Sequence, residues 1–258
     1  MSETQVAQGD SVREASGERY AAAAEFYRSL FDVRLARSDE DVHTSQALRY
    51  RVYCEETGYL PKDDNPAGLE HDSFDAQSEA VLLIHKATGA CVGTVRVIIP
   101  DDSAPGRLFP AMDCSEAMLS LVDKDMPLAT TGELSRFTIA PEFRRRAGDT
   151  LYQQVYDFGI EAGDMRRIIP YMALGLFAGI MEIVTLHTLS HLCAIIDPAL
   201  LRMLKRLHLH FPPVGGVVEY HGMRQPVFVS TRALYDGMTA LPDAYLRIVN
   251  RDGQLQLP

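Results

Sequence analysis

The sequence predicts a single α/β (α+β) domain in which helices flank a mixed sheet. Two apolar, β-branched runs, residues 80–85 and 92–99, are separated by Lys-Ala-Thr-Gly, which is typical of an antiparallel hairpin. Further strand patterns alternate with helix patterns, without an internal repeat or a step in composition that would mark a second domain. The 258 residues, 47% of them hydrophobic, are enough to bury one sizeable core.

The first elements follow from local signals. The polar composition of residues 1–18 predicts disorder. Residues 19–250 are expected to form the domain, with helical extensions at both ends. Ser38 followed by three acidic residues predicts the start of a helix that ends near Gly58. The other expected elements are a helix at 20–30, strands at 31–36 and 129–139, an irregular segment at 101–127, helices at 150–162 and 171–189, a strand at 191–196, a basic helix at 199–207, strands at 214–219 and 226–230, and a helical tail at 232–249.

Composition excludes several classes of protein. Lys plus Arg number 25 and Asp plus Glu 35, so the net charge of −10 argues against nucleic-acid binding. Four scattered cysteines without a CxxC pair, and a polar start without an apolar signal region, predict a cytoplasmic protein with reduced thiols. The apolar segment 168–196 is interrupted by Pro170, Glu182 and two histidines, so it predicts a buried helix and strand rather than a span of ~18 apolar residues. Peripheral membrane contact stays open.

Charged residues within apolar strands mark a candidate site. In the string Glu133-Leu134-Ser135-Arg136, alternate residues face opposite sides of a strand, unless a bulge changes the phase and brings both charges into one cleft. Arg96 lies in the apolar run 92–99 and needs a partner if it is buried, and Asp72 and Asp75 precede that hairpin. Structural ion pairing is the alternative interpretation of these groups.

Basic residues recur at two further places. Arg144, Arg145 and Arg146, followed by Ala-Gly at an expected helix start, predict an anion site, with a charged turn as the alternative. The stretch 201–211 holds Arg202, Lys205 and Arg206 and no acid, which favours either a dock for an acidic partner or a solvated helix face.

Other common site motifs are missing from the sequence. His187 and His191 have the i, i+4 spacing of metal ligands, with Cys193 nearby, but no HExxH is present and we expect no metal. Neither G-x-S-x-G, a Walker lysine motif nor G-x-G-x-x-G occurs, so hydrolase, NTPase and Rossmann functions lack support.

Five strings in order resemble a known family. They are Leu48-Arg49-Tyr50-Arg51-Val52-Tyr53, Gly58-Tyr59, Glu70-His71-Asp72-Ser73-Phe74-Asp75, Gly93-Thr94-Val95-Arg96 and Glu133-Leu134-Ser135-Arg136-Phe137. Together they resemble the acyl-homoserine-lactone synthases, on the fold of the GNAT-type N-acetyltransferases, although Tyr59 replaces the usual tryptophan. The strings 52–56 and 219–226 are more similar to the PEP-CTERM/exosortase system-associated acyltransferases. N-acyl amino acid synthases are similar in fold and chemistry.

This resemblance implies an N-acyltransferase that moves a fatty acyl group from acyl carrier protein to the amine of a small acceptor, an amino acid. Glu133 would be the base, and backbone N–H groups at a bulge would stabilise the oxyanion. Arg96 and Arg136 would hold Glu133 and the aspartates in one network, and one arginine would bind the acceptor carboxylate bidentately. The remaining expected substrate contacts are a lid of Arg49, Tyr53 and Tyr59, together with Asp72, Asp75, Ser135 and Phe137. Helix 171–189 would line an acyl tunnel, with a purely core role as the alternative.

The donor would be an acyl-phosphopantetheine, with no tightly bound cofactor. Residues 139–151 resemble a degraded R-x-x-G-x-G/A loop, which fits carrier protein better than acetyl-coenzyme A, although acyl-CoA stays open. The expected donor contacts are Arg144, Arg145, Arg146, Arg202, Lys205 and Arg206. Two alternatives remain: a lactone synthase that uses S-adenosylmethionine, and a non-catalytic acyl-binding module.

Overall fold

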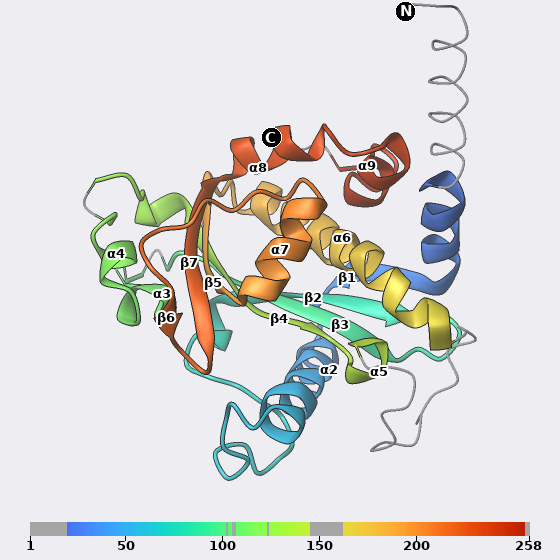
Figure 1. Ribbon diagram of the computed structural model, residues 1–258. Coiled ribbons are helices and arrows are strands. Elements are labelled where there is room, and N and C mark those ends of the chain that lie inside the picture. Colours follow the sequence, from blue (N-terminus) through green and yellow to red (C-terminus); the bar gives the residue numbers. More distant parts are fainter. Residues whose placement is uncertain (1–19, 102, 105–106, 123, 145–161, 256–258) are drawn as a thin grey trace, which may run out of the picture.

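The computed structural model describes residues 20–101, 103–104, 107–122, 124–144 and 162–255. A mixed sheet of seven strands, in the order β1-β2-β3-β4-β5-β7-β6, forms its centre (Figure 1). Neighbouring strands are antiparallel except β4 and β5, which are parallel. The strands are β1 (Phe31–Leu35), β2 (Ser78–His85), β3 (Cys91–Ile98), β4 (Thr131–Ile139), β5 (His191–Ile196), β6 (Val218–Glu219) and β7 (Met223–Ser230).

Helices cover both faces of this sheet, which confirms the expected α/β class. Helix α2 (Asp39–Tyr50), continued by a π-helical turn (Arg51–Glu56), packs on one face, and α6 (Ala162–Leu186) packs on the other (Figure 1). The other helices are α3 (Pro110–Asp113), α4 (Glu116–Leu119), α5 (Pro141–Arg144), α7 (Pro198–Arg206), α8 (Thr231–Met238) and α9 (Asp243–Val249), with residues 20–30 also helical.

The apolar core lies between the sheet and α6. Met172, Leu176 and Ile180 of this helix are fully buried in the larger hydrophobic cluster. A side chain at Gly179 would overlap Val81 of β2, so glycine permits the close approach of helix and strand. Among the described residues, one stretch, Ile168–Leu186, is long and apolar enough to cross a membrane, and 72% of it is buried inside the protein. That burial is typical of a core helix and gives a membrane span little support.

A β-bulge interrupts β4 at the candidate site. Arg96 pairs with Ser135, whereas Thr94 pairs with Thr138, so β4 carries one additional residue between these pairs. Arg136 takes the left-handed conformation there, with φ of 56°. The bulge therefore turns the Ser135 and Arg136 side chains to the same face of the sheet, as expected if the charges of this string share a cleft.

The two parallel strands separate just before this bulge. Pairing between β4 and β5 ends at Leu134 and Ala194. Beyond it, β4 continues with β3 to Ile139 and β5 continues with β7 to Ile196, so the sheet opens between them (Figure 1). Backbone N–H and C=O groups along this opening lack a neighbouring strand, which makes it suited to binding an extended ligand.

Several element boundaries differ from the expectations. Segment 101–127, expected to be irregular, contains α3 and α4. The strand expected at 214–219 shortens to β6, and the helix expected at 171–189 starts at Ala162 and passes through Pro170. The helix expected at 150–162 begins outside the described residues.

Candidate active site

Three arginines and three carboxylates form a buried ion network on the α2 face. Arg49 comes from α2, where it is 1% exposed. Its Nε donates to Glu70, while Nη1 and Nη2 donate to the two carboxylate oxygens of Asp75 at 2.6 and 3.1 Å. Arg49 therefore connects α2 to the loop before β2 through these hydrogen bonds. Its side chain is buried in the ion network, whereas we expected it in a lid over the substrate.

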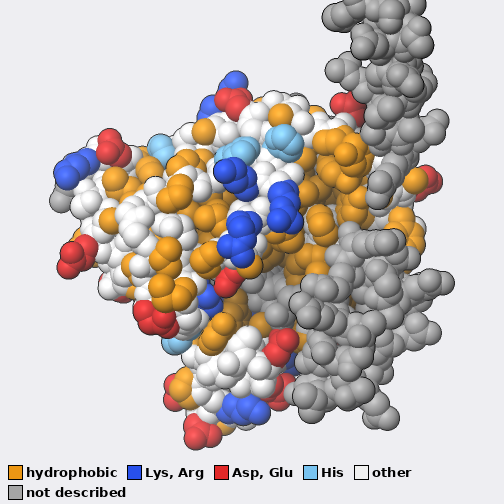
Figure 2. Space-filling model, in the orientation of Figure 1, with side chains coloured by type: hydrophobic (Ala, Val, Ile, Leu, Met, Phe, Trp, Pro, Cys, Tyr) orange, Lys and Arg blue, Asp and Glu red, His pale blue; other side chains and the backbone are white. Residues whose placement is uncertain are grey.

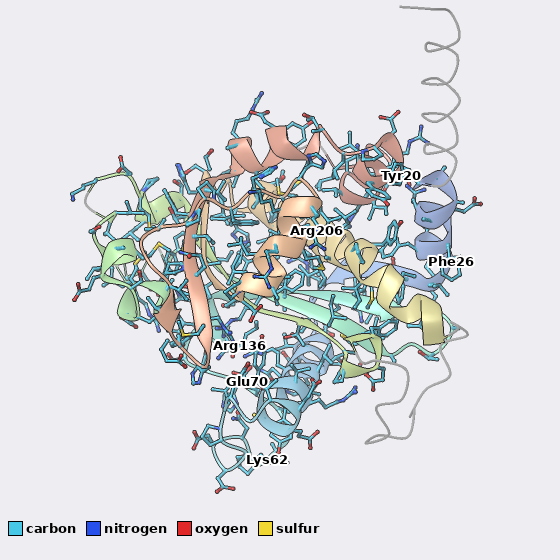
Figure 3. The ribbon with its side chains drawn as sticks, viewed as in Figure 1. Tyr20, Phe26, Lys62, Glu70, Arg136 and Arg206 are labelled. Carbon is cyan, nitrogen blue, oxygen red and sulfur yellow. The ribbon has the colours of Figure 1, made fainter. Side chains whose placement is uncertain are left out.

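The other two arginines come from β3 and β4. Arg96, also 1% exposed, donates to both oxygens of Asp72 at 2.6 and 2.9 Å, and to Ser135 Oγ at 2.9 Å. Arg136 donates from Nε and Nη2 to Glu70, and from Nη2 to Asp72 at 3.0 Å. Figure 3 shows Arg136 beside Glu70, between the sheet and α2. The three positive charges are thus matched by three negative ones.

The network keeps its carboxylates ionised. Burial by itself would raise the pKa of Asp75, but the hydrogen bonds and charge of Arg49, with the charge of Arg96, outweigh it and lower that pKa to about 2. The pKa values of Glu70 and Asp72 are lowered in the same way, against burial, by Arg136 and Arg96 respectively. Buried charges that are paired and hydrogen-bonded in this way are costly to separate.

Glu133 lies next to this network without a hydrogen bond to it. The side chain is 4% exposed, and its Oε2 accepts the backbone N–H of Ala111, at the start of α3, at 2.8 Å. Within the described part of the chain, nothing donates to Oε1. Burial raises the pKa of Glu133 to about 7, and the Ala111 hydrogen bond and the charges of Arg96 and Arg136 only partly oppose it.

One expectation about the arginines is therefore corrected. They hold Glu70, Asp72 and Asp75, and not Glu133, because these carboxylates occupy the guanidinium groups first. Bidentate binding of an acceptor carboxylate by one arginine stays a prediction; each nitrogen of Arg49 and Arg96 already donates to a protein side chain. Arg136, 18% exposed, has one nitrogen, Nη1, without an acceptor among the described residues.

The expected aromatic residues lie at different depths. Tyr53 accepts a hydrogen bond from Thr138 Oγ1 at 3.1 Å, and its ring centre is 5.7 Å from the Arg136 guanidinium. Tyr59 is exposed, and Arg224 covers its ring. Phe137 lies on the opposite, α6 face and packs on Phe177, so it belongs to the core side of the sheet and does not join the ion network.

Sequence reasoning missed three contributors to the site. Glu70 was part of a quoted string but was not proposed as a site residue, although a third arginine beside two buried ones requires a third carboxylate. The Ala111 N–H depends on a helix of four residues, which leaves no periodic signal. Tyr220, on the turn between β6 and β7, is half-buried and lies within electrostatic range of Arg136, Glu133 and Asp72.

Helix α7 carries the basic patch, which we define as Arg202, Lys205 and Arg206. All three side chains are exposed, and across the described residues none of them forms an ion pair. Figure 2 shows these basic side chains gathered over α7 and bordered by apolar surface. The side chains of the other expected donor contacts, Arg144 to Arg146, lie outside what the structure describes.

The three potential metal ligands have separate partners. His187 Nε2 lies 2.7 Å from Glu79, His191 stacks on Phe228, and Cys193 is buried in β5. No group of three metal-ligating side chains occurs in residues 20–144 and 162–255, as far as these ranges are described.

Comparison with known proteins adds a family match. Residues 48–154 match the family described as acetyltransferase (GNAT) domain. The L-ornithine N(alpha)-acyltransferase of Agrobacterium fabrum (strain C58 / ATCC 33970) is 25% identical over 137 residues, which are 50% of this chain and 46% of that protein. The chain thus spans about half the length of this curated relative.

Solved structures agree on the fold. The acyl-homoserine lactone synthase LasI superposes with a TM-score of 0.53 at 17% identity, covering 80% of this chain and 95% of that one. The CoA-dependent acyl-homoserine lactone synthase BjaI gives 0.54 at 16% identity, covering 88% and 91%. FeeM, an N-acyl amino acid synthase from uncultured soil microbes, gives 0.53 at 12% identity, covering 80% and 94%. The chain therefore has a GNAT-like fold of the type seen in these synthases.

Proposed function

We propose that this protein is an N-acyltransferase that moves a fatty acyl group from the phosphopantetheine thioester of an acyl carrier protein to the amine of a small amino-acid-like acceptor. One observation carries the proposal: Glu133, a buried carboxyl with a pKa near 7 and an unbonded Oε1, lies beside a bulge where β4 and β5 separate. A thioester entering this opening would reach the carboxyl.

The reaction balances with one base. Glu133 Oε1 takes a proton from the acceptor ammonium, and the free amine attacks the thioester carbon. Backbone N–H groups near the bulge stabilise the oxyanion that forms. The C–S bond then breaks, the second amine proton passes to the leaving thiolate, and the products are an amide and a free thiol.

The raised pKa suits this role. An α-amino group has a pKa of about 7.7–8.0, so a base with a pKa near 7 both accepts its proton readily and is largely ionised at slightly alkaline pH. An ordinary glutamate, with a pKa of about 4.3, would be a weaker base for the same proton. The burial of Glu133 thus supports its use in proton transfer.

Different parts of the protein would recognise the two substrates: Arg136 the acceptor and helix α7 the donor. Arg136 Nη1 offers the N–H groups of one nitrogen to an acceptor carboxylate, beside the partly exposed Asp72. The unpaired basic patch on α7 favours an acidic carrier protein over free CoA, since complementary charge steers such an encounter. BjaI is CoA-dependent, so acyl-CoA is the alternative donor.

Two finer assignments belong to the same proposal. The strings near Val52 and Tyr220 support the PEP-CTERM/exosortase-associated branch, beyond the broader GNAT-like assignment. A cytoplasmic location is supported by four cysteines, all of which are free thiols.

Lactone synthesis from S-adenosylmethionine is the second candidate, because the fold is shared with LasI and BjaI. Mass spectrometry of lipids extracted from a host that expresses the parent or the Glu133→Gln variant separates the candidates. We expect new N-acyl amino acids with the parent and little with the variant. Acyl lactones would instead establish the second candidate, and an unchanged lipid profile would contradict both.

A further inference from the structure

Arg224, on β7, joins three segments that are distant in sequence. Its Nη2 donates to the backbone carbonyl of His221 at 2.7 Å, and its Nη1 lies 3.3 Å from Asp197 Oδ2. Its guanidinium also lies over the ring of Tyr59, 5.2 Å from the ring centre. The Arg224 side chain is 14% exposed, whereas its partners Asp197 and Tyr59 lie at the surface.

The turn that Arg224 holds is conformationally unfavourable by itself. Val218 pairs with Arg224 and Glu219 with Met223, which leaves a loop of three residues at 220–222. His221 and Gly222 both have positive φ values, of 50° and 95°. A non-glycine residue in this region costs free energy and persists where the surroundings hold it. The Arg224 hydrogen bond to the His221 carbonyl, and that of Gly222 N to Glu219, supply this support.

The same turn places Tyr220 near enough to the candidate active site for the charges there to act on its phenol. The half-buried phenol interacts electrostatically with Arg136, Glu133 and Asp72, and its hydroxyl has no hydrogen-bond partner among the described residues. The position of the turn therefore fixes where this hydroxyl lies relative to the free Nη1 of Arg136.

The Asp197 contact ties this arrangement to the donor side. Asp197 follows β5 and caps α7, since its Oδ1 accepts the backbone N–H groups of Ala199 and Leu200. Its other oxygen, Oδ2, is the one that faces Arg224. Arg224 thus spans from the base of α7, across the turn, to the loop that follows the α2 segment.

We infer that Arg224 is a positioning residue that holds the 220–222 turn, and with it the Tyr220 hydroxyl, over the acceptor side of the site. This inference rests on the proposed function for its kinetic consequence, but not for its structural one. It makes Arg224 a determinant of acceptor affinity, while donor docking depends on the exposed face of α7.

Hydrogen exchange tests the structural part without any assay of activity. Arg224→Met removes the charge-assisted bonds and keeps much of the side-chain volume. We expect the amides of residues 219–224 to exchange about tenfold faster or more, because loss of such bonds lowers the local opening free energy. Arg232→Met is the matched control, because Arg232 is exposed and its one ion pair among the described residues is with Asp236 on its own helix. Equal protection of the turn in the parent and Arg224→Met would overturn the inference.

Kinetics test the functional part. For Arg224→Met we expect the KM for the acceptor to rise about tenfold, a transition-state cost of about 1.4 kcal/mol, with the KM for the acyl carrier protein unchanged. Arg224→Lys keeps the charge but not the forked geometry, so its KM for the acceptor should lie between those of the parent and Arg224→Met. Tyr220→Phe should raise the same KM, and combined with Arg224→Met it should add little.

The experiments distinguish failure of the positioning role of Arg224 from failure of the proposed function. An acceptor KM that stays at the parent value in Arg224→Met, or that rises equally in Arg232→Met, contradicts the positioning role. A parent protein that transfers no acyl group contradicts the proposed function, while the exchange result still decides whether Arg224 holds the turn.

Discussion

The pKa of Glu133 depends on where its neighbours direct their hydrogen bonds. Two arginines lie close enough to favour its charge, yet their N–H groups are directed to other carboxylates. Burial therefore dominates, and Glu133 becomes the protonatable member of an otherwise ionised site. The pKa values of the network carboxylates are thus lowered while that of Glu133 is raised, although these groups share a face.

The pH dependence of stability tests this assignment. The pKa of Glu133 is raised by burial to about 7, so between its unfolded value of about 4.5 and pH 7 the folded state binds more protons than the unfolded state. Stability from this group is present below the unfolded pKa and is lost as pH rises through the folded pKa. Relative to the parent, Glu133→Gln should gain about 1–3 kcal/mol in free energy of unfolding between pH 4.5 and 7.5. Urea titrations with a constant difference between the two proteins would contradict the raised pKa.

The ion network predicts a contrast between two neighbouring arginines. Arg49→Met removes the two hydrogen bonds to Asp75 and one of the bonds to buried Glu70, and it should cost about 3–5 kcal/mol. Arg51→Met removes a partly exposed pair with Glu142 and should cost less than about 1 kcal/mol. Urea unfolding of both variants measures the difference. Similar costs for the two would show that the network does not stabilise the fold.

At this scale the sequence predicted the arginine and aspartate partners but not the full site. A charge inside an apolar strand demands a partner, so Arg96 with Asp72 was predictable. Glu70 and Tyr220 reach the site only through tertiary contacts, with loops and turns whose paths leave no local pattern. The charges of β4 could share one cleft only if this strand contained a bulge, and the strand register confirms a bulge at Arg136.

Elements with strong local signals were predicted well. Ser38 caps α2 through Asp41 N, and Asp41 in turn accepts the Ser38 N–H, as a serine before an acidic turn indicates. Helices α3 and α4 were missed because four residues show no helical periodicity. The split between β4 and β5 is a property of the assembled sheet, and no single strand pattern encodes it.

Removal of the α2 cap should have a moderate effect. Ser38→Ala deletes the bond to Asp41 N and should lower the free energy of unfolding by about 1 kcal/mol. Ser73→Ala, at an exposed serine before η2 (Asp75–Gln77), is the control and should change it little. Chemical denaturation measures both, and a Ser38→Ala variant as stable as the control would remove the cap from the account.

Helix α7 predicts a salt-dependent interaction with the donor. Reversing Arg202, Lys205 and Arg206 to Glu should weaken binding of acyl carrier protein and make it less sensitive to salt, with the largest effect at low ionic strength. Reversal of Lys62, Arg232 and Arg247, which are also exposed, gives the same change in net charge elsewhere. Titration calorimetry with equal affinities for the two triple variants would exclude α7 as the dock.

For the whole molecule, the net charge of −10 would repel an acidic carrier protein except where cations gather. The sheet opening lies between α7 on one side and the ion network on the other (Figure 3). Donor and acceptor would thus approach Glu133 from opposite sides. Acyl transfer would then take place where the two substrates meet, beside the bulge in β4.

The most direct test is thiol release from acyl carrier protein, measured against pH with an amino acid acceptor, for the parent and Glu133→Gln. The parent rate should rise through pH 7 as Glu133 ionises. The variant should be about 10²–10⁴ slower at neutral pH, with the gap narrowing as pH rises because free amine becomes abundant. A Glu133→Gln variant as fast as the parent at neutral pH would contradict the role of Glu133 as the base.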